Sequence, residues 1–273
     1  MQDYQPFKLL EHSGWSESGV SRTYETWFTA LTSQSIEPLL EAVGAGPGVR
    51  LLDVATGPGH LARQAADLGA SVIGVDVSPA MVEMAQGLYP EVEFRAGDAE
   101  SLPFPDVSFD AVVMNYGLLH LSRPELAIAE VFRVLRPGGR FAFTVWAPPS
   151  VARGFGSILE AVQTKGDPSV PLPPGPPFFR FADAGESAAA LKAAGFKAPS
   201  AKEFSQRWQL PSADALLEVF EEGTVRTRAL LKGQTPAAMM AIRAAVNDAA
   251  QAFATPEGLD IPMPAVLSFA AKP

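Results

Sequence analysis

The chain has 273 residues, enough to bury a substantial hydrophobic core as one large α/β domain or as a domain with a cap. Its net charge of −9 argues against a nucleic-acid backbone or an anionic membrane as the main partner. The absence of cysteine excludes disulfides and thiolate chemistry. No apolar run reaches the roughly 20 residues of a membrane helix, and the first residues do not read as a signal peptide, so we expect a cytoplasmic location.

The first 45 residues are predicted to form a helical lid. Apolar side chains at helical spacing indicate a leading helix over 22–43 that ends near Gly44. The glycine- and proline-rich run 44–48 then interrupts the chain before the first strand.

Residues 46–150 alternate between strands and helices. Helices of about ten residues separate the predicted strands, which lie at 50–54, 71–76, 92–96, 109–114 and 140–146. Ser78 before Pro79 is typical of a helix N-terminus, and Ser122 to Glu125 fits a capping box. The alternation predicts a doubly wound, mostly parallel sheet. Right-handed crossovers should then gather the first glycine turn, Asp76 and the segments after strands three and four at one crevice.

The second half of the chain changes character. Residues 151–210 form a variable segment that includes the proline-rich run 167–177, an expected surface loop or lid. Three phenylalanines near 180 are either packing residues of that lid or walls of a pocket. A helix at about 185–194 and a strand near 202–210 follow. Residues 211–260 are predicted to be a helical cap inserted before the final strand, which lies within 261–273 at about 265–270.

One glycine turn carries most of the functional signal. The apolar strand that contains Asp53 runs into a turn with Gly57 and Gly59, and the next strand ends on Asp76. Glycine lets the backbone approach a ligand, and an acid at a strand tip suits the two hydroxyls of a ribose. The turn also satisfies the dinucleotide-binding pattern, so an NAD(P)-dependent oxidoreductase is the alternative. Asp53 favours an ammonium group over a pyrophosphate beside this turn.

Five motifs in order make the chain similar to a known family. They are 52–59 (LDVATGPG), 74–81 (GVDVSPAM), 97–104 (GDAESLPF), 109–113 (FDAVV) and 135–140 (LRPGGR). Over roughly residues 50–146 the chain resembles the class I S-adenosylmethionine-dependent methyltransferases, in particular their small-molecule and quinone branch. The resemblance implies a Rossmann-like fold with a seven-stranded sheet and S-adenosyl-L-methionine as cofactor, with S-adenosyl-L-homocysteine as product. It also implies methyl transfer to an oxygen, nitrogen or carbon atom of a small, partly apolar metabolite.

The resemblance further implies roles for single residues. The residues that would hold the methionine end are Asp53, Ala55, Thr56, Gly57 and Gly59. Those that would hold the nucleoside are Asp76 on the ribose, Val77 and Met81 on the adenine face, Asp98 on the adenine amino group and the Ala99 amide on the ring. Asn115 and Tyr116, at the end of strand four, would lie beside the reacting sulfonium. Tyr24 and Trp27 are either core residues or cofactor contacts through cation–π attraction.

Two positions, Ala55 and His120, allow more than one interpretation. The family usually has glycine where this chain has Ala55, and a methyl group there disfavours a positive φ and crowds the cofactor. A non-catalytic S-adenosylmethionine-binding protein is therefore a further alternative. His120 lies where an acceptor would meet the methyl group, and is either a general base or a capping and packing residue. The histidines are too dispersed to suggest a metal site, and nothing in the sequence indicates the oligomeric state.

Overall fold

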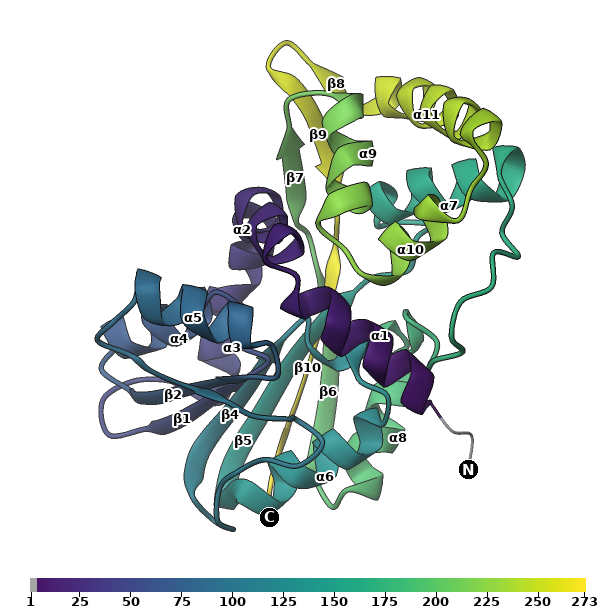
Figure 1. Cartoon of the computed structure of the whole chain (residues 1–273). Helices are drawn as coiled ribbons and strands as arrows, with labels where there is room; N and C mark the ends of the chain where they lie inside the picture. The colour runs from purple at the N-terminus through teal and green to yellow at the C-terminus, as the bar shows by residue number, and fades with distance from the viewer. Residues whose placement is uncertain (1–3) are drawn as a thin grey trace.

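A seven-stranded sheet forms the centre of the computed structural model, which describes residues 4–273 (Figure 1). The strand order is β3-β2-β1-β4-β5-β10-β6. Neighbours among β1 to β5 pair in parallel, and β10 is antiparallel to both β5 and β6. The strands are β1 (Arg50–Val54), β2 (Ser71–Asp76), β3 (Glu93–Ala96), β4 (Phe109–Asn115), β5 (Leu135–Trp146), β6 (Lys197–Phe204) and β10 (Ala265–Ala271). The predicted α/β fold with a mostly parallel sheet is confirmed.

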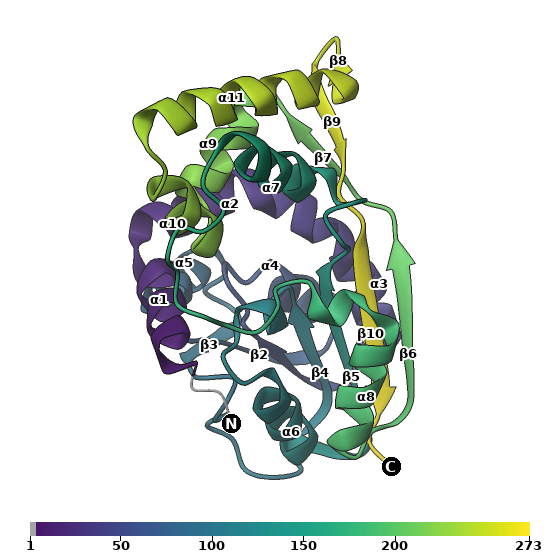
Figure 2. The same ribbon diagram turned by 90° about the vertical axis from the view of Figure 1, so that its right-hand side faces the viewer.

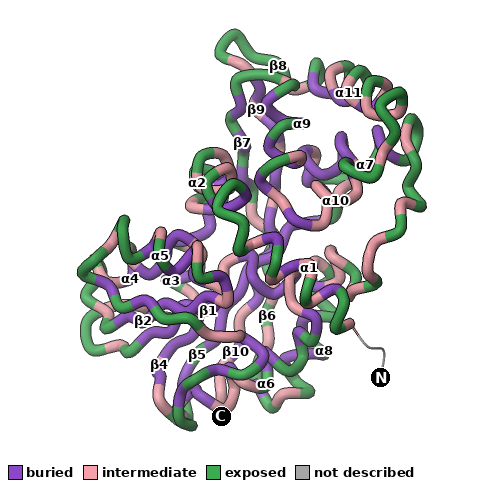
Figure 3. The backbone as a smooth tube through the Cα atoms, viewed as in Figure 1, coloured by how far each residue is buried: buried purple, intermediate pink, exposed green. Residues whose placement is uncertain are grey.

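Helices cover both faces of this sheet (Figures 1 and 2). One face carries α3 (Ile36–Val43), α4 (His60–Asp67) and α5 (Pro79–Leu88), and the other carries α6 (Pro124–Val134) and α8 (Ala184–Ala193). Successive strand residues point to opposite faces, so Leu51 joins one apolar cluster and Leu52 the other. Burial on both faces explains why these strands read as continuous apolar runs. Figure 3 shows the central strands as largely buried backbone.

The N-terminal segment differs from the single leading helix that the sequence predicts. It consists of α1 (Gln5–Ser16), α2 (Ser18–Thr32), a 3-10 turn (Ser33–Ser35) and α3. The expected helix over 22–43 is therefore wrong as one element. The Ser35 hydroxyl donates to the Thr32 carbonyl at 2.6 Å, and such local hydrogen bonds compete with a regular helix. Gly44 ends α3 in the left-handed conformation with φ +69°, as expected.

A second lobe caps the sheet (Figure 1). Its helices are α7 (Arg153–Lys165), α9 (Ala213–Glu222), α10 (Arg226–Lys232) and α11 (Pro236–Ala250). Its small antiparallel sheet consists of β7 (Arg207–Leu210), β9 (Gly258–Pro262) and β8 (Ala254–Thr255). In the part of the chain that the structure describes, no helix is both long and apolar enough to cross a membrane.

The strand expected near 202–210 is wrong as one element, because β6 ends at Phe204 and β7 begins at Arg207 in the other sheet. Between them the buried Gln206 side chain donates to the Leu31 carbonyl at 3.1 Å and accepts from the Tyr116 hydroxyl at 2.5 Å. These hydrogen bonds fix the chain where it passes from one sheet to the other.

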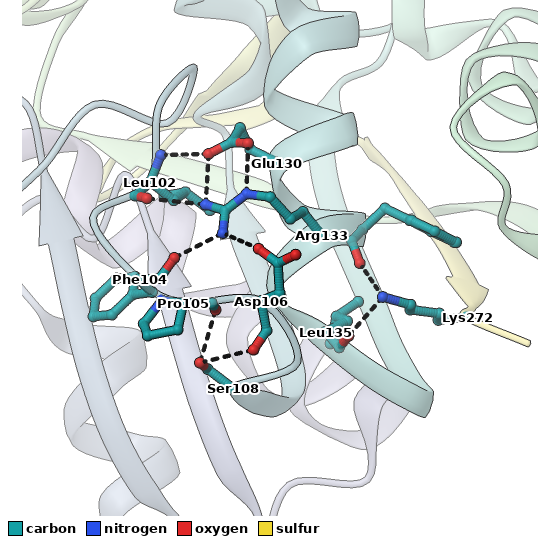
Figure 4. Close-up of polar contacts among 10 residues, drawn as sticks. Leu102, Phe104, Pro105, Asp106, Ser108, Glu130, Arg133, Leu135 and Lys272 are labelled. Atoms are coloured by element: carbon teal, nitrogen blue, oxygen red, sulfur yellow. Dashed lines mark hydrogen bonds and ion pairs between the residues drawn. The ribbon is translucent and has the colours of Figure 1, made fainter.

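The loop that follows β3 is held by α6 (Figure 4). The Arg133 guanidinium donates to the carbonyls of Leu102 and Phe104 at 3.0 and 2.7 Å, and Glu130 accepts from the Leu102 amide at 2.8 Å. Because this loop also carries Asp98, α6 fixes the far side of the predicted cofactor site.

The capping box predicted at Ser122 is wrong. Arg123 stands at the N-cap position of α6 without a side-chain cap. The Ser122 hydroxyl donates instead to the buried Glu100 carboxylate at 2.7 Å, because a buried acid gains more from that donor than a helix end does. The Ser78 cap is confirmed, since its hydroxyl accepts from the Met81 amide at 3.2 Å.

Candidate active site

A cavity of about 1020 Å³ lies at the carboxyl ends of β1, β2 and β4, beneath α1 and α2. Most of the predicted site residues line it: Tyr24, Asp53, Ala55, Thr56, Gly57, Asp76, Val77, Met81, Asp98, Asn115, Tyr116 and His120. Three others do not line it. Trp27 packs in the cap, where its carbonyl accepts from the Trp208 indole at 2.9 Å. Gly59 lies against Phe94, and Ala99 is buried.

The glycine turn adopts left-handed backbone at Ala55 (φ +55°), Gly57 (φ +52°) and Gly59 (φ +88°). A Cβ atom on Gly59 would stand 2.6 Å from the Phe94 ring, so only glycine fits there. Ala55 has the positive φ that a methyl group disfavours, at a typical cost of about 1–2 kcal/mol. Gly117 faces it, and a Cβ on Gly117 would lie 2.6 Å from the Ala55 methyl. The room that Ala55 needs is provided by this second glycine.

Asp53 has one buried carboxylate oxygen without a hydrogen-bond partner among residues 4–273. Its other oxygen accepts from the Thr56 hydroxyl at 2.7 Å. Burial raises the pKa of Asp53 to about 7, and the nearby Asp76 charge adds to the rise while Thr56 opposes it. A buried acceptor without a donor is costly, so this side of the cavity calls for a donor from a ligand.

Asp76 is held by two backbone amides. It accepts from Gly57 at 2.9 Å and from Ser78 at 2.9 Å, one bond to each carboxylate oxygen. Burial raises the pKa of Asp76, and these amide bonds work in the opposite direction. Each oxygen keeps a further lone pair, so the carboxylate can shape the turn and still accept from two ligand hydroxyls.

Asn115, at the end of β4, lines the cavity, but its side-chain amide forms hydrogen bonds within the protein. Its oxygen accepts from the Thr144 hydroxyl at 2.5 Å and lies 2.8 Å from the Ser35 hydroxyl oxygen, and its nitrogen donates to the Thr32 carbonyl at 3.1 Å. The side chain thereby ties the end of α2 to the edge of the sheet.

Lys8 on α1 bridges two acids at the opposite wall, and no sequence pattern indicates this role. Its ammonium lies 2.6 Å from Asp98 and 2.8 Å from Glu100. Burial alone would lower the pKa of Lys8, but the two carboxylates together raise it. Burial would also raise the pKa of Glu100, yet Lys8, the Ser122 hydroxyl and the Arg123 amide lower it to about 2. This cluster fixes α1 over the cavity.

His120 is paired with Glu11, a second α1 residue that the sequence did not reveal. The His120 Nδ1 lies 2.9 Å from the Glu11 carboxylate, which also accepts from the Trp15 indole at 3.0 Å. Glu11 is only 3% exposed. An ionised carboxylate can only accept, so it holds the proton on Nδ1 and leaves Nε2 free to accept one.

Known proteins are similar to the part of the chain that holds this cavity. A family described as a methyltransferase domain matches residues 52–143. The demethylmenaquinone methyltransferase of Renibacterium salmoninarum is 42% identical over 112 residues, which are 41% of this chain and 47% of that protein. Over this region the chain is similar to S-adenosylmethionine-dependent methyltransferases. It spans about half the length of the curated relatives it matches.

Solved structures agree with this fold. The YcgJ protein of Bacillus subtilis is similar over 88% of this chain and 98% of its own, with a TM-score of 0.59 and 25% identity. The [4+2]-cyclase SpnF is similar over 88% of this chain and 80% of its own, with a TM-score of 0.54 and 27% identity.

The donors and acceptors of the cavity fit S-adenosyl-L-methionine, the cofactor that the sequence motifs imply. The unpartnered oxygen of Asp53 suits its ammonium group, and the spare lone pairs of Asp76 suit the ribose hydroxyls. A pyrophosphate would place a second negative charge beside Asp53.

A second, smaller cavity adjoins the first. The two share Trp15, Tyr24, Tyr116 and His120 as lining residues. Burial raises the pKa of Tyr24 to about 12, so this ring is neutral at pH 7. The Tyr116 ring stacks on Trp146 at 3.9 Å between centroids. A polar cavity thus shares a wall with an aromatic one, which is the arrangement that a reaction between two substrates needs.

Proposed function

We propose that this protein transfers a methyl group from S-adenosyl-L-methionine to an oxygen, nitrogen or carbon atom of a small, partly apolar metabolite. The observation that carries the proposal is the shared wall: the cavity that holds Asp53 and Asp76 meets an aromatic cavity at His120. The demethylmenaquinone methyltransferases among the relatives support an acceptor with a flat ring system. A cytoplasmic location stays a prediction from the sequence.

When bound, the cofactor supplies a methyl group on an electron-poor sulfonium. The residues of this chain provide alignment and exclusion of water, which such a transfer needs more than strong acid–base catalysis. Asp53 pairs with the ammonium group and Asp76 accepts from the ribose hydroxyls. Asp98 accepts from the adenine amino group and shares its carboxylate with Lys8. The roof of the cavity is α1, which contributes Lys8 and Trp15.

His120 is positioned to remove a proton from the acceptor. Its ring lines both cavities, and the free Nε2 would accept a proton from a hydroxyl or amine as that atom takes the methyl group. Glu11, held by Trp15, then stabilises the imidazolium. A positioned base typically contributes about 10²–10⁴ in rate.

Entry of the cofactor requires α1 to move. The helix is attached to the far wall by Lys8 and to the turn after β2 by the Ser78 hydroxyl, which donates to the Trp15 carbonyl at 2.8 Å. The buried Glu11, paired with His120 at 2.9 Å, and the buried Phe7 also hold this helix, so its opening breaks polar contacts and exposes one large apolar side chain while leaving the sheet intact. We assign α1, within the N-terminal segment 1–45, the role of lid.

The test has two steps. Isothermal titration with S-adenosyl-L-homocysteine and with NAD separates the proposed cofactor from that of an oxidoreductase. A metabolite mixture incubated with S-adenosyl-L-methionine carrying a deuterated methyl group is then searched by mass spectrometry for labelled products. Tight binding of S-adenosyl-L-homocysteine together with a labelled product supports the proposal, whereas binding of NAD contradicts it.

Binding without any product would favour a non-catalytic S-adenosylmethionine-binding protein. The similarity to a [4+2]-cyclase shows why the second step is needed, because a fold does not by itself determine the reaction.

A further inference from the structure

We propose that the aromatic cavity binds an aromatic carboxylate, with Arg226 as the residue that recognises its acid group. The inference rests on the proposed function, because it assigns the substrate class of the same site. It is carried by the shape of the cavity walls and by one unpartnered guanidinium nitrogen.

The walls of this cavity suit a flat ring. Apart from the shared residues, the lining aromatic side chains are Phe28, Trp146, Phe155 and Phe178. Phe155 lies 5.7 Å from Trp146 and 5.5 Å from Phe178 between ring centroids. These rings come from α2, β5, α7 and the loop before α8, so both lobes close around the space. Aromatic rings pack favourably on or against the edges of other rings, so these walls favour a planar aromatic ligand.

One cation lines this aromatic space. Arg226, at the start of α10, has its Nη1 buried without a hydrogen-bond partner among residues 4–273. Its guanidinium lies over the Phe7 ring, 5.4 Å from the centroid. The neighbouring Arg228 does not line the cavity; its Nη1 pairs with Glu17 at 2.6 Å, although its Nε is also buried without a partner among residues 4–273.

An unpaired buried donor favours a ligand that supplies an acceptor. A planar guanidinium matches a carboxylate with two parallel hydrogen bonds. An amine would be repelled by Arg226, and a neutral ring would leave its Nη1 unpaired. With the carboxylate on α10, the rest of the ring extends along the walls shared with the cofactor cavity, where His120 stands.

The test measures binding of three probes of the same shape: 2-naphthoate, 2-naphthamide and 2-naphthylmethylamine. Each is titrated calorimetrically into the wild-type protein with and without saturating S-adenosyl-L-homocysteine. We expect 2-naphthoate to bind at least tenfold more tightly than the amide and the amine. Arg226→Gln should abolish this preference and Arg226→Lys should retain part of it. Arg228→Gln is the matched control and should leave the preference intact.

The proposal is overturned if the amide or the amine binds as tightly as 2-naphthoate, if none of the three binds, or if Arg226→Gln keeps the preference. Affinity for S-adenosyl-L-homocysteine, measured on every variant, reports that the sheet lobe is folded. It also separates the two proposals. If the wild-type protein does not bind S-adenosyl-L-homocysteine, the methyltransferase function is contradicted, independently of how the three probes bind.

Discussion

Replacing Asp53 with asparagine removes a buried charge while keeping the shape of the side chain. The folded protein holds the pKa of Asp53 at about 7, against an ordinary value of 3.8. Because one pKa unit corresponds to about 1.4 kcal/mol, keeping this carboxylate ionised in the ligand-free protein at pH 8 costs about 4 kcal/mol. The folded state binds the proton more tightly than the unfolded state, so the stability of the wild type falls as pH rises from about 4 to 7 and then levels off.

The amide of Asp53→Asn does not ionise, so the unfolding free energy of this variant does not fall between pH 4 and pH 7 on account of residue 53. Urea unfolding of both proteins without cofactor should show that the unfolding free energy of the variant, relative to that of the wild type, is about 2–3 kcal/mol higher at pH 8 than at pH 5. The same substitution should weaken S-adenosyl-L-homocysteine binding at pH 8 by about 10- to 100-fold, because a neutral amide cannot pair with the ammonium group.

A matched control is Asp110→Asn. Asp110 lies at the start of β4, away from the cavity, where it pairs with Arg136 at 2.7 Å. Its replacement should leave the affinity for S-adenosyl-L-homocysteine unchanged. The reasoning is refuted if the stability difference between wild type and Asp53→Asn is the same at both pH values, or if the variant keeps full affinity.

Three further substitutions test the site. Glu100→Gln should destabilise the protein at pH 7 by up to about 3 kcal/mol, because the pKa of Glu100 is lowered to about 2 in the folded state. This stabilisation is fully present above pH 4.5 and is lost as the pH falls towards 2. An equal loss of unfolding free energy at pH 7 and pH 3, measured by urea unfolding, would contradict this. Ala55→Gly should stabilise by about 1 kcal/mol by relieving the positive φ, and a lower Tm in thermal unfolding would disprove the strain. His120→Asn should lower kcat at least about 100-fold and Glu11→Gln about tenfold. The affinity for the cofactor should be unchanged in both variants. If His120→Asn turns over the acceptor as fast as the wild type, His120 is not the general base.

The sequence was sufficient for the part of the site that lies in continuous motifs. Asp53, Gly57 and Asp76 belong to strand–turn segments whose residues are fixed by local geometry, so their spacing alone predicts a shared crevice. Even the unusual Ala55 was visible as a conflict between residue type and backbone. The compensating Gly117 lies 62 positions further on and is recognisable only in three dimensions.

The residues that the sequence did not reveal reach the site through tertiary packing. Lys8, Glu11 and Arg226 are single charges on helices, and such charges usually belong to a solvated face. No pattern separates them from the many exposed charges of this chain. The small sheet was missed for a related reason, since β8 has two residues and β9 five, too few for a clear alternation to develop.

A crystal structure of the protein with S-adenosyl-L-homocysteine would show directly which groups hold the cofactor. We expect the ligand's ammonium group within hydrogen-bond distance of the oxygen of Asp53 that has no partner among residues 4–273 of the free protein, and both ribose hydroxyls at Asp76. A ligand bound elsewhere, or bound in this cavity with its ammonium group turned away from Asp53, would contradict this expectation.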